Sequence, residues 1–569
     1  MHGEPGIVRR ATLAIGGAFS NSVKATRANE FLKWGNRLPF GSAMREERLS
    51  MASGLFREVA ASEMKKGDVK EAVGALNGLA EMHGSRAKAL KGVGEFERAA
   101  EEYGNQGKVY GEIAEVLRKD DDKKGEMDAC REQISAYGNA VGAMEKQVGL
   151  LKEGDDYGAL SDAYEQMIAA YSNIEDVFWG LGDSKSLAET CEKRIAVYEA
   201  MFDLSKKTND PETSSWALGM QAEEYNKKAE AHMETARRLE GSDLRGMTDE
   251  CTGAADAFEA RVRLLQKTSQ IEDLADEREN IVNAMTPVVE KWKWLAKGSS
   301  DVAPNLVVEA YEEIIGALDR IAGVRQKQAN DHKKMTNIEG EVSAYGLMAD
   351  ALKDMADAQR TIKEYRKAGE TYAKAVKALE KKGNVLKKHD DYAGVAGVCQ
   401  EKADVYACMT ILFGTDLQNQ GMADKARRKR INELGKKGDS LKNAGDYGGA
   451  AEAYGEQAKS IDGLAFELSL HDDISGRIGA LGKQVDALEN KAEMLKQAGD
   501  ENESRGAHKE AAGVLGKRAD ILRENGDYKG EAGTYRRIAD VLSGAGETEG
   551  AAEALRLAGD ADRVLLAEN

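Results

Sequence analysis

The sequence predicts an all-α fold: an α-solenoid of antiparallel helical hairpins, in which one helix and its turn take about 27 residues. Three observations predict this fold. Apolar residues recur at spacings of four and three, as on one face of a helix. A Gly-Asp pair precedes this pattern in several copies. Only 5 prolines occur in 569 residues, which favours long uninterrupted helices.

The repeat is clearest in two stretches, LKNAGDYGGAAEAYGEQAKSI at 441–461 and LRENGDYKGEAGTYRRIADVL at 522–542. Counted from each leading Leu as position 0, Gly is at position 4, Asp at 5, Tyr at 6, a small residue at 10 and Tyr again at 13. Ala follows at 17 and an apolar residue at 20. The intervals from position 6 onward are 4, 3, 4 and 3, which fit a helix and not the alternation of a strand.

Looser copies of this spacing begin at Leu90, Leu117, Leu151, Phe178, Leu386, Leu468 and Leu495. Near the end of the chain the copies that begin at 441, 468, 495 and 522 follow one another at equal intervals. Two intervals differ from this one by a heptad: the interval from 117 to 151 is longer, and the interval from 522 to 542 is shorter. Since a heptad makes two helical turns, we expect one helix that is longer and one that is shorter, each keeping its buried face.

The Gly-Asp pair explains how one helix leads into the next. Gly445 can take the left-handed conformation that ends a helix, and Asp446 can cap the amide groups that open the next helix. So short a turn makes the next helix antiparallel. On this interpretation Tyr447, Ala451 and Tyr454 pack against neighbouring helices. The matching residues of the later copy are Tyr528, Ala532 and Tyr535.

Gly445, Asp446, Tyr447, Ala451 and Tyr454 resemble the second helix of a tetratricopeptide repeat, or a helix of the soluble NSF attachment proteins. The period departs from that of tetratricopeptide repeats, which is longer by a heptad. The Trp-Leu-Gly half of the tetratricopeptide pattern and its closing proline are also missing. The resemblance implies an α-solenoid and a role as a protein-binding scaffold, and it assigns no functional residue.

The first segment, residues 1–50, is predicted to be a basic lead-in helix or arm. Within it, residues 5–29 contain no acidic residue. On a helix, five apolar residues would share one face: Val8, Ala11, Ile15, Phe19 and Val23. This composition resembles a mitochondrial transit peptide, and the alternative is an amphipathic first helix of the array.

Three further segments follow. Residues 51–230 are predicted to form an N-terminal repeat array, 231–358 an irregular region of longer helices, and 359–569 a C-terminal repeat array. The irregular region is predicted to contain an apolar helical face from Leu244 to Phe258, through Met247, Cys251 and Ala254. It is also predicted to contain a capping box, SQIE at 269–272, and a loop, GSSDVAPN at 298–305. Pro287 is predicted to kink or end its helix.

The charge balance limits the partners. The formal net charge is −18 and the pI is about 5.2, so the surface repels nucleic acid and anionic membranes and favours basic proteins. No apolar run approaches the ~20 residues of a transmembrane span. Five cysteines without a C-x-x-C motif favour a reducing compartment, for which we expect the cytoplasm, with mitochondria as the alternative.

We predict no catalytic, cofactor-binding or metal-binding residue. Cys130, Cys191 and Cys399 replace the second aromatic residue, at position 13, and are expected in the core. His508 also takes position 13 and His83 takes position 20. The remaining two histidines of interest are expected in turns: His389 and His471.

Two charged runs suggest function, but each has a simpler explanation. In DDDKKGEMDACRE at 120–132, Asp120, Asp122 and Gly125 match a calcium loop, whereas Lys124 and Arg131 occupy ligand positions, so we expect a repeat turn. ARRKR at 426–430 could be a nuclear-import signal or a contact for an acidic partner, and a solvated helix face is the favoured interpretation.

The expected function is therefore a non-enzymatic scaffold for protein–protein interaction. The alternative is a structural subunit of a large complex or polymer, through self-association or assembly with other proteins. An enzyme has no specific motif to support it.

Overall fold

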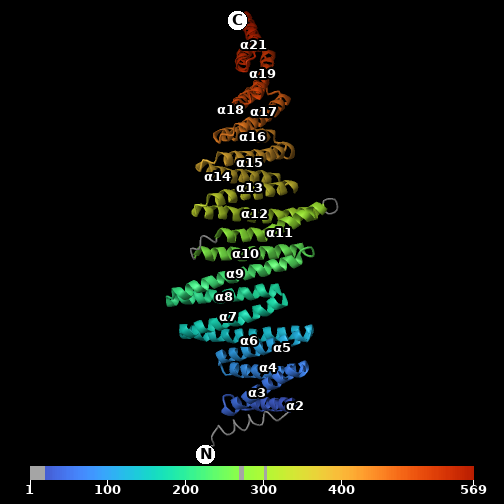
Figure 1. The fold of residues 1–569 in the computed structure, drawn as a ribbon, viewed down its shortest axis with the longest axis vertical. Helices are drawn as coiled ribbons and strands as arrows, with labels where there is room; N and C mark the ends of the chain where they lie inside the picture. Colours follow the sequence, from blue (N-terminus) through green and yellow to red (C-terminus); the bar gives the residue numbers. More distant parts are fainter. Residues whose placement is uncertain (1–19, 268–273, 300–303, 569) are drawn as a thin grey trace, which may run out of the picture. The chain divides into compact units, whose positions relative to one another are not determined.

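The computed structural model describes residues 20–267, 274–299 and 304–568 of the chain. Every regular element in these ranges is helical and none is a β-strand, which confirms the predicted all-α class. Residues 20–267 form one compact unit, and the described residues from Leu274 onward form a second (Figure 1).

The helices of the first unit are α2 (Asn21–Arg37), α3 (Ala43–Lys66), α4 (Val69–Gly92), α5 (Phe96–Lys119), α6 (Lys123–Gly154), α7 (Tyr157–Leu181), α8 (Ser184–Thr208), α9 (Pro211–Leu239) and α10 (Leu244–Lys267). Those of the second unit are α11 (Leu274–Ser299), α12 (Pro304–Lys334), α13 (Ile338–Thr361), α14 (Tyr365–Lys388), α15 (Tyr392–Ile411), the π-helical turn η1 (Leu412–Asp416), α16 (Gln420–Asn443), α17 (Tyr447–Leu470), α18 (Ile474–Gln497), α19 (Glu501–Glu524), α20 (Tyr528–Gly544) and α21 (Thr548–Glu568).

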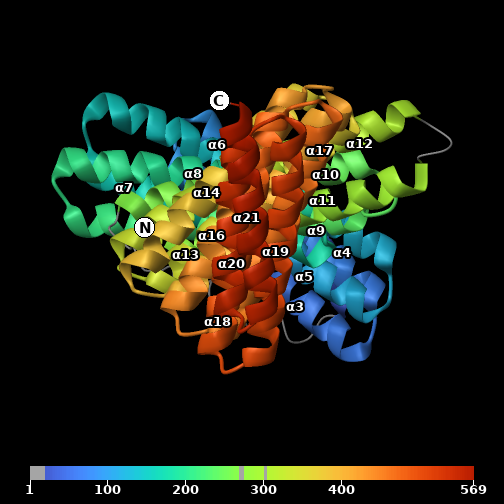
Figure 2. The ribbon, with the colours of Figure 1, turned by 90° about the horizontal axis from the view of Figure 1, so that it is seen from above.

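Within each unit a helix packs mainly on the helix before it and the helix after it (Figure 1). Polar pairs across α8 and α9 show the direction: Gln221 donates to Glu199, and Lys228 to Glu192. The partner on α8 with the lower number pairs with the residue on α9 that has the higher number, so the two helices are antiparallel. In Figure 2 the last helices of the second unit, α19 to α21, run alongside one another in the same way. The predicted solenoid of antiparallel, tetratricopeptide-like hairpins is thus confirmed.

The turns have the predicted chemistry. Gly445 has a φ of +80°, in the left-handed region that suits glycine, and ends α16. Asp446 then caps α17, because its Oδ1 accepts a hydrogen bond from the amide of Gly449 at 2.8 Å. The same cap is made by Asp68, Asp122, Asp156, Asp183, Asp210, Asp391, Asp473, Asp500 and Asp527. In other turns a residue other than glycine takes the left-handed conformation. Five of these residues are Asp or Asn: Asp121, Asp155, Asn209, Asp390 and Asp472. The other three are Thr336, Lys363 and Gln418.

The predicted apolar face of α17 is buried. Ala451, Tyr454, Ala458 and Ile461 all lie in the core, whereas Tyr447 at the start of the helix is half-buried. Position 6 therefore closes the edge of the core and does not lie at its centre.

Some of the glycines inside helices allow close packing. A Cβ on Gly438 of α16 would lie 2.7 Å from the ring of Tyr454, closer than real contacts allow. The Tyr454 hydroxyl donates to Asp439 at 2.5 Å. Gly107 and Tyr137 make a similar contact between α5 and α6. Small residues thus let large rings approach the neighbouring backbone.

Both predicted changes of helix length are found. α17 has 24 residues, α6 has 32 and α20 has 17. α20 is shorter by one heptad, and α6 is longer by a heptad and one further residue. The interval between repeats therefore sets helix length to within one residue.

The remaining expectations are met in part. α11 continues through Pro287 to Ser299, so the proline does not end its helix. The capping box at 269–272 lies outside the described residues. So do 300–303 of the predicted loop, whose flanking residues belong to α11 and α12. Of the N-terminal apolar face only Val23 is described, and it is exposed on α2. The four-segment organisation remains a prediction.

Candidate functional site

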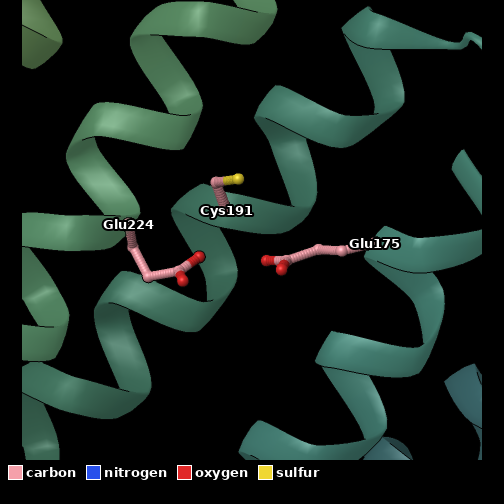
Figure 3. A group of neighbouring side chains, drawn as sticks. All are labelled: Glu175, Cys191 and Glu224. Carbon is pink, nitrogen blue, oxygen red and sulfur yellow. The ribbon is translucent and has the colours of Figure 1, made fainter. Parts of the chain in front are cut away.

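The first unit contains a buried cluster of charged side chains at the middle of three consecutive helices. Glu175 comes from α7, Cys191 and Arg194 from α8, and Glu224 from α9. Figure 3 shows the two carboxylates pointing toward each other from opposite helices, with Cys191 beside them. One ligand atom of each of these three residues lies within 4.8 Å of the others.

Arg194 neutralises the two carboxylates. Its Nη1 bonds to Glu175 and lies 3.4 Å from Glu224, and its Nη2 donates to the Tyr198 hydroxyl at 3.3 Å. Lys227 adds a second cation 2.9 Å from Glu224. Two cations thus face two carboxylates, which is the balance that buried ions need.

Burial, and then repulsion by Glu224, raises the pKa of the Glu175 carboxyl to about 7. The side chain of Glu175 is 7% exposed and that of Glu224 is fully covered. The two acids therefore share a region in which the second negative charge is costly, even beside the guanidinium.

Cys191 is not an activated nucleophile. Burial and the two neighbouring carboxylates raise the pKa of its thiol, whereas a nucleophile needs the thiolate. A metal ion between Glu175 and Glu224 would have to displace Arg194. The cluster is thus a closed ion-pair network that joins three helices.

The second unit repeats this arrangement on α14, α15 and α16. Counted from the first residue of each helix, four residue types recur in the same register, and at a fifth position Arg is replaced by Lys. The matched pairs are Cys191 and Cys399, Arg194 and Lys402, Tyr198 and Tyr406, Glu224 and Glu433, and Lys227 and Lys436. In the second copy Glu433 lies 2.8 Å from the ammonium group of Lys402 and 2.9 Å from that of Lys436.

One residue breaks the correspondence. Eighteen positions after the first residue of its helix, α7 carries Glu175, whereas α14 carries Gly383. A cavity of about 500 Å³ opens at this place, lined by Leu379 to Lys387 of α14, Tyr392 to Lys402 of α15 and Glu433 to Asn443 of α16. We call it the α15 groove.

The groove has a different charge balance from the closed cluster. Lys402 and Glu433 are almost covered, with side chains 10% and 7% exposed. Burial opposes ionisation of Glu433, but the hydrogen bonds from Lys402 and Lys436 outweigh it and lower the pKa of that carboxyl. Burial raises the pKa of the Cys399 thiol to about 11, so this cysteine too is unreactive near neutral pH.

The predicted core positions are confirmed for the cysteines. Cys130, Cys191 and Cys399 are buried, and none of the five cysteines forms a disulfide. His83 is buried as well, with its Nδ1 2.7 Å from Glu102, whereas His508 is half-buried.

His389 and His471 lie exposed at the ends of α14 and α17, in the turns where they were expected.

The two charged runs are helical. Asp122 caps α6 by accepting from the amide of Gly125 at 3.0 Å, so residues 120–132 form a turn and the start of a helix, not a calcium loop. ARRKR lies on α16, where Arg428 and Lys429 are exposed and Arg427 pairs with Glu467. The run is therefore helical and partly solvated, and its role stays a prediction.

Glu175, Arg194 and Glu224 were missed because acidic and basic residues are abundant in the sequence. A usable signal was present. Cys, a cation and Tyr stand at positions 13, 16 and 20 of the copies that begin at both Phe178 and Leu386. In both copies the cation at position 16 stands between the buried positions 13 and 20. A charged residue that recurs at such a place indicates a buried ion pair.

The sequence matches no protein-family model and no curated protein. Among solved structures, it is similar to a circular tandem repeat protein with a novel repeat topology and enhanced subunit contact surfaces. The identity is 12% over 83% of this chain and 100% of that chain, with a TM-score of 0.35. It is also similar to BtubC (BKLC) from P. vanneervenii, with 13% identity over 44% of this chain and 92% of that one and a TM-score of 0.18.

A third similar structure is yeast Tom70, with 12% identity over 90% of this chain and 96% of that one and a TM-score of 0.15. At such scores these similarities carry no functional argument, and the fold rests on the helices themselves. Among the described helices, none combines the length and the apolar character that crossing a membrane requires.

Proposed function

We propose that this protein is a non-enzymatic scaffold that binds another protein. The supporting observation is the exposure of its tryptophans. Four of the five are exposed: Trp34 by 59%, Trp179 by 69%, Trp216 by 44% and Trp294 by 75%. Only Trp292 is fully buried.

Exposed tryptophan favours protein binding for a physical reason. Its large rigid ring buries much apolar area at a small loss of side-chain entropy, and Trp is enriched among the residues that dominate binding energy. The net charge of −18 adds long-range attraction for basic proteins and repulsion from nucleic acid.

Two features support a role without catalysis. The thiols of Cys191, Cys251 and Cys399 have pKa values raised by burial, so no described cysteine of this group is activated. In both charged clusters, each carboxylate is paired with a cation. Reduced, buried cysteines also fit the cytoplasm. The mitochondrial alternative depends on residues 5–29, of which 5–19 lie outside the described ranges.

The scaffold is tested by affinity purification of the full chain with quantitative mass spectrometry, comparing wild type with Trp179→Ala and with Trp294→Ala. We expect at least one protein to be retained by wild type and lost from one variant, while circular dichroism stays unchanged. Lys297→Ala, an exposed change on the same helix as Trp294, is the matched control. Identical partner profiles for all four proteins would count against the tryptophan surface.

A structural subunit is the second candidate, and α21 favours it. Leu555 and Leu566 are 57% and 76% exposed, and eleven positions on a helix bring them to the same face. A second copy could cover this face. Light scattering should then show a mass of at least two chains, which falls to that of one chain in the Leu555→Ser, Leu566→Ser double variant. A monomeric wild-type chain would exclude this candidate.

A further inference from the structure

We propose that the α15 groove binds a carboxylate of a partner peptide, with Lys402 and Lys436 as the groups that receive it. The inference rests on the proposed scaffold function and specifies the chemistry of the bound segment. It follows from comparing the two copies of one side-chain arrangement.

The first argument is a missing counter-charge. In the first unit, Arg194 and Lys227 face two carboxylates, Glu175 and Glu224. In the second unit, Lys402 and Lys436 form ion pairs with a single carboxylate, Glu433, and the more distant Glu380 also attracts Lys436. The position of the absent carboxylate is Gly383, which has no side chain. A ligand carboxylate at this place would supply the second carboxyl group that Glu175 supplies in the first unit.

The second argument is space. The groove has a volume of about 500 Å³, and Gly383 lines it. A Cβ on Gly383 would lie 3.3 Å from Val398, a tight contact to which Val398 would have to adjust slightly. Because Gly383 has no side chain, the groove is open at the register position that Glu175 occupies in the first unit.

The third argument is length, which favours a peptide as the source of the carboxylate. The lining runs from Leu379 to Lys387 on α14 and from Glu433 to Asn443 on α16. At ~1.5 Å per residue these walls are about 12 and 15 Å long. An extended peptide rises ~3.3 Å per residue, so about four residues fit along the groove.

Other charges of the lining do not replace the missing one. Glu380 is exposed and attracts Lys436 only from a distance, because the ion pair of Lys436 is with Glu433. Asp439 is exposed and already accepts the hydroxyl hydrogen of Tyr454 at 2.5 Å. Lys387 is exposed on the same wall and adds a third ammonium group. The net charge of −18 acts from the whole surface and is screened beyond ~10 Å, so it does not prevent a local contact with buried Lys402.

The test uses the full chain and a fluorescein-labelled tetraglutamate peptide with an amidated C-terminus. Amidated tetraglutamine with the same label is the control, because it lacks only the side-chain carboxylates. Fluorescence anisotropy should show saturable binding of tetraglutamate and none of tetraglutamine. Gly383→Glu places a carboxylate of the chain itself in the groove, as Glu175 does on α7. It should lower the affinity for tetraglutamate by at least about tenfold. Gly383→Ala adds the same Cβ without charge and should change affinity by less than about threefold.

Absence of saturable tetraglutamate binding would overturn the proposal, and so would equal weakening by Gly383→Ala and Gly383→Glu. Glutarate distinguishes the two sources of the carboxylate. If the affinity for glutarate equals the affinity for tetraglutamate, the groove is a binding site for a small dicarboxylic acid. A peptide is then excluded as its occupant. The tryptophan variants report on scaffold function separately, since neither Trp179 nor Trp294 lines the groove.

Discussion

Glu175 shows how one residue can differ in role from its many counterparts. The chain has 99 acidic residues, and few of those in the described ranges are buried, but this carboxylate lies between three helices beside a second one. Its charge is supported by Arg194 and opposed by burial and by Glu224. A small change in proton concentration near neutrality is therefore expected to alter the stability of the first unit.

The pH dependence has a definite sign. The pKa of Glu175 is raised from an ordinary value of 4.5 to about 7, so the folded state holds the proton more tightly than the unfolded state. Its stabilising contribution is complete below pH ~4.5 and is lost as pH rises through ~7. Compared with Glu175→Gln, which stays neutral, wild type should lose about 2 to 4 kcal/mol across this window.

Urea denaturation at several pH values measures this difference. Glu189→Gln, an exposed change on α8, is the control and should follow wild type. Parallel pH curves for wild type and Glu175→Gln would contradict the assignment.

Tyr454 illustrates the contribution of a buried ring. Only 3% exposed, it packs on Gly438 and donates to Asp439. Tyr454→Ala should cost about 3 to 5 kcal/mol of unfolding free energy, since it leaves a large cavity. Tyr447→Ala on the same helix is the comparison: this ring is half-buried and its loss should be clearly smaller. Equal shifts of the denaturation midpoint would mean that Tyr454 is no better packed than Tyr447.

At the scale of the element, a helix and its turn form one module. The Asp cap, the left-handed residue before it and the buried face recur while helix length varies from 17 residues in α20 to 32 in α6. Changes of two turns return the apolar face to nearly the same side. The module therefore tolerates length changes that would misplace a helix if they were of one or two residues.

The cap itself can be tested. Asp446→Ala removes the acceptor of the Gly449 amide and should cost about 1 kcal/mol, whereas Asp446→Ser keeps an acceptor and should cost less. Thermal unfolding followed by circular dichroism measures both variants. If Asp446→Ala melts like wild type, the hydrogen bond contributes nothing to stability.

At the scale of the molecule, stability comes from contacts between helices adjacent in the chain. Such arrays behave as sums of modules and of nearest-neighbour interfaces. Because the described residues form two compact units, each should retain its own core when separated.

Fragments 1–273 and 274–569, produced separately, should therefore each show a helical circular dichroism spectrum and a cooperative thermal transition. The intact chain is the reference for helix content per residue. An unfolded spectrum for either fragment would show that the unit depends on the other half of the chain.

Spacing alone predicted the helical class, the antiparallel hairpins, the Asp446 cap, the burial of Ala451 and Tyr454, and the two heptad changes. These features are local: a helix repeats every 3.6 residues, and a turn depends on the conformations that Gly and Asp permit. The resemblance to tetratricopeptide helices followed from the same local pattern.

Only the tertiary structure decided which charged side chains are buried. It alone also showed that the position of Glu175 in the first unit corresponds to an open groove in the second. Glu175, Arg194 and Glu224 stand on three different helices, and nothing in their local sequence distinguishes them from solvated neighbours. Their energies depend on distance and on exclusion of water, which arise when the helices pack. For the same reason Gly383 is one of 60 glycines in the sequence, and only the packed helices show the space that it leaves beside Lys402.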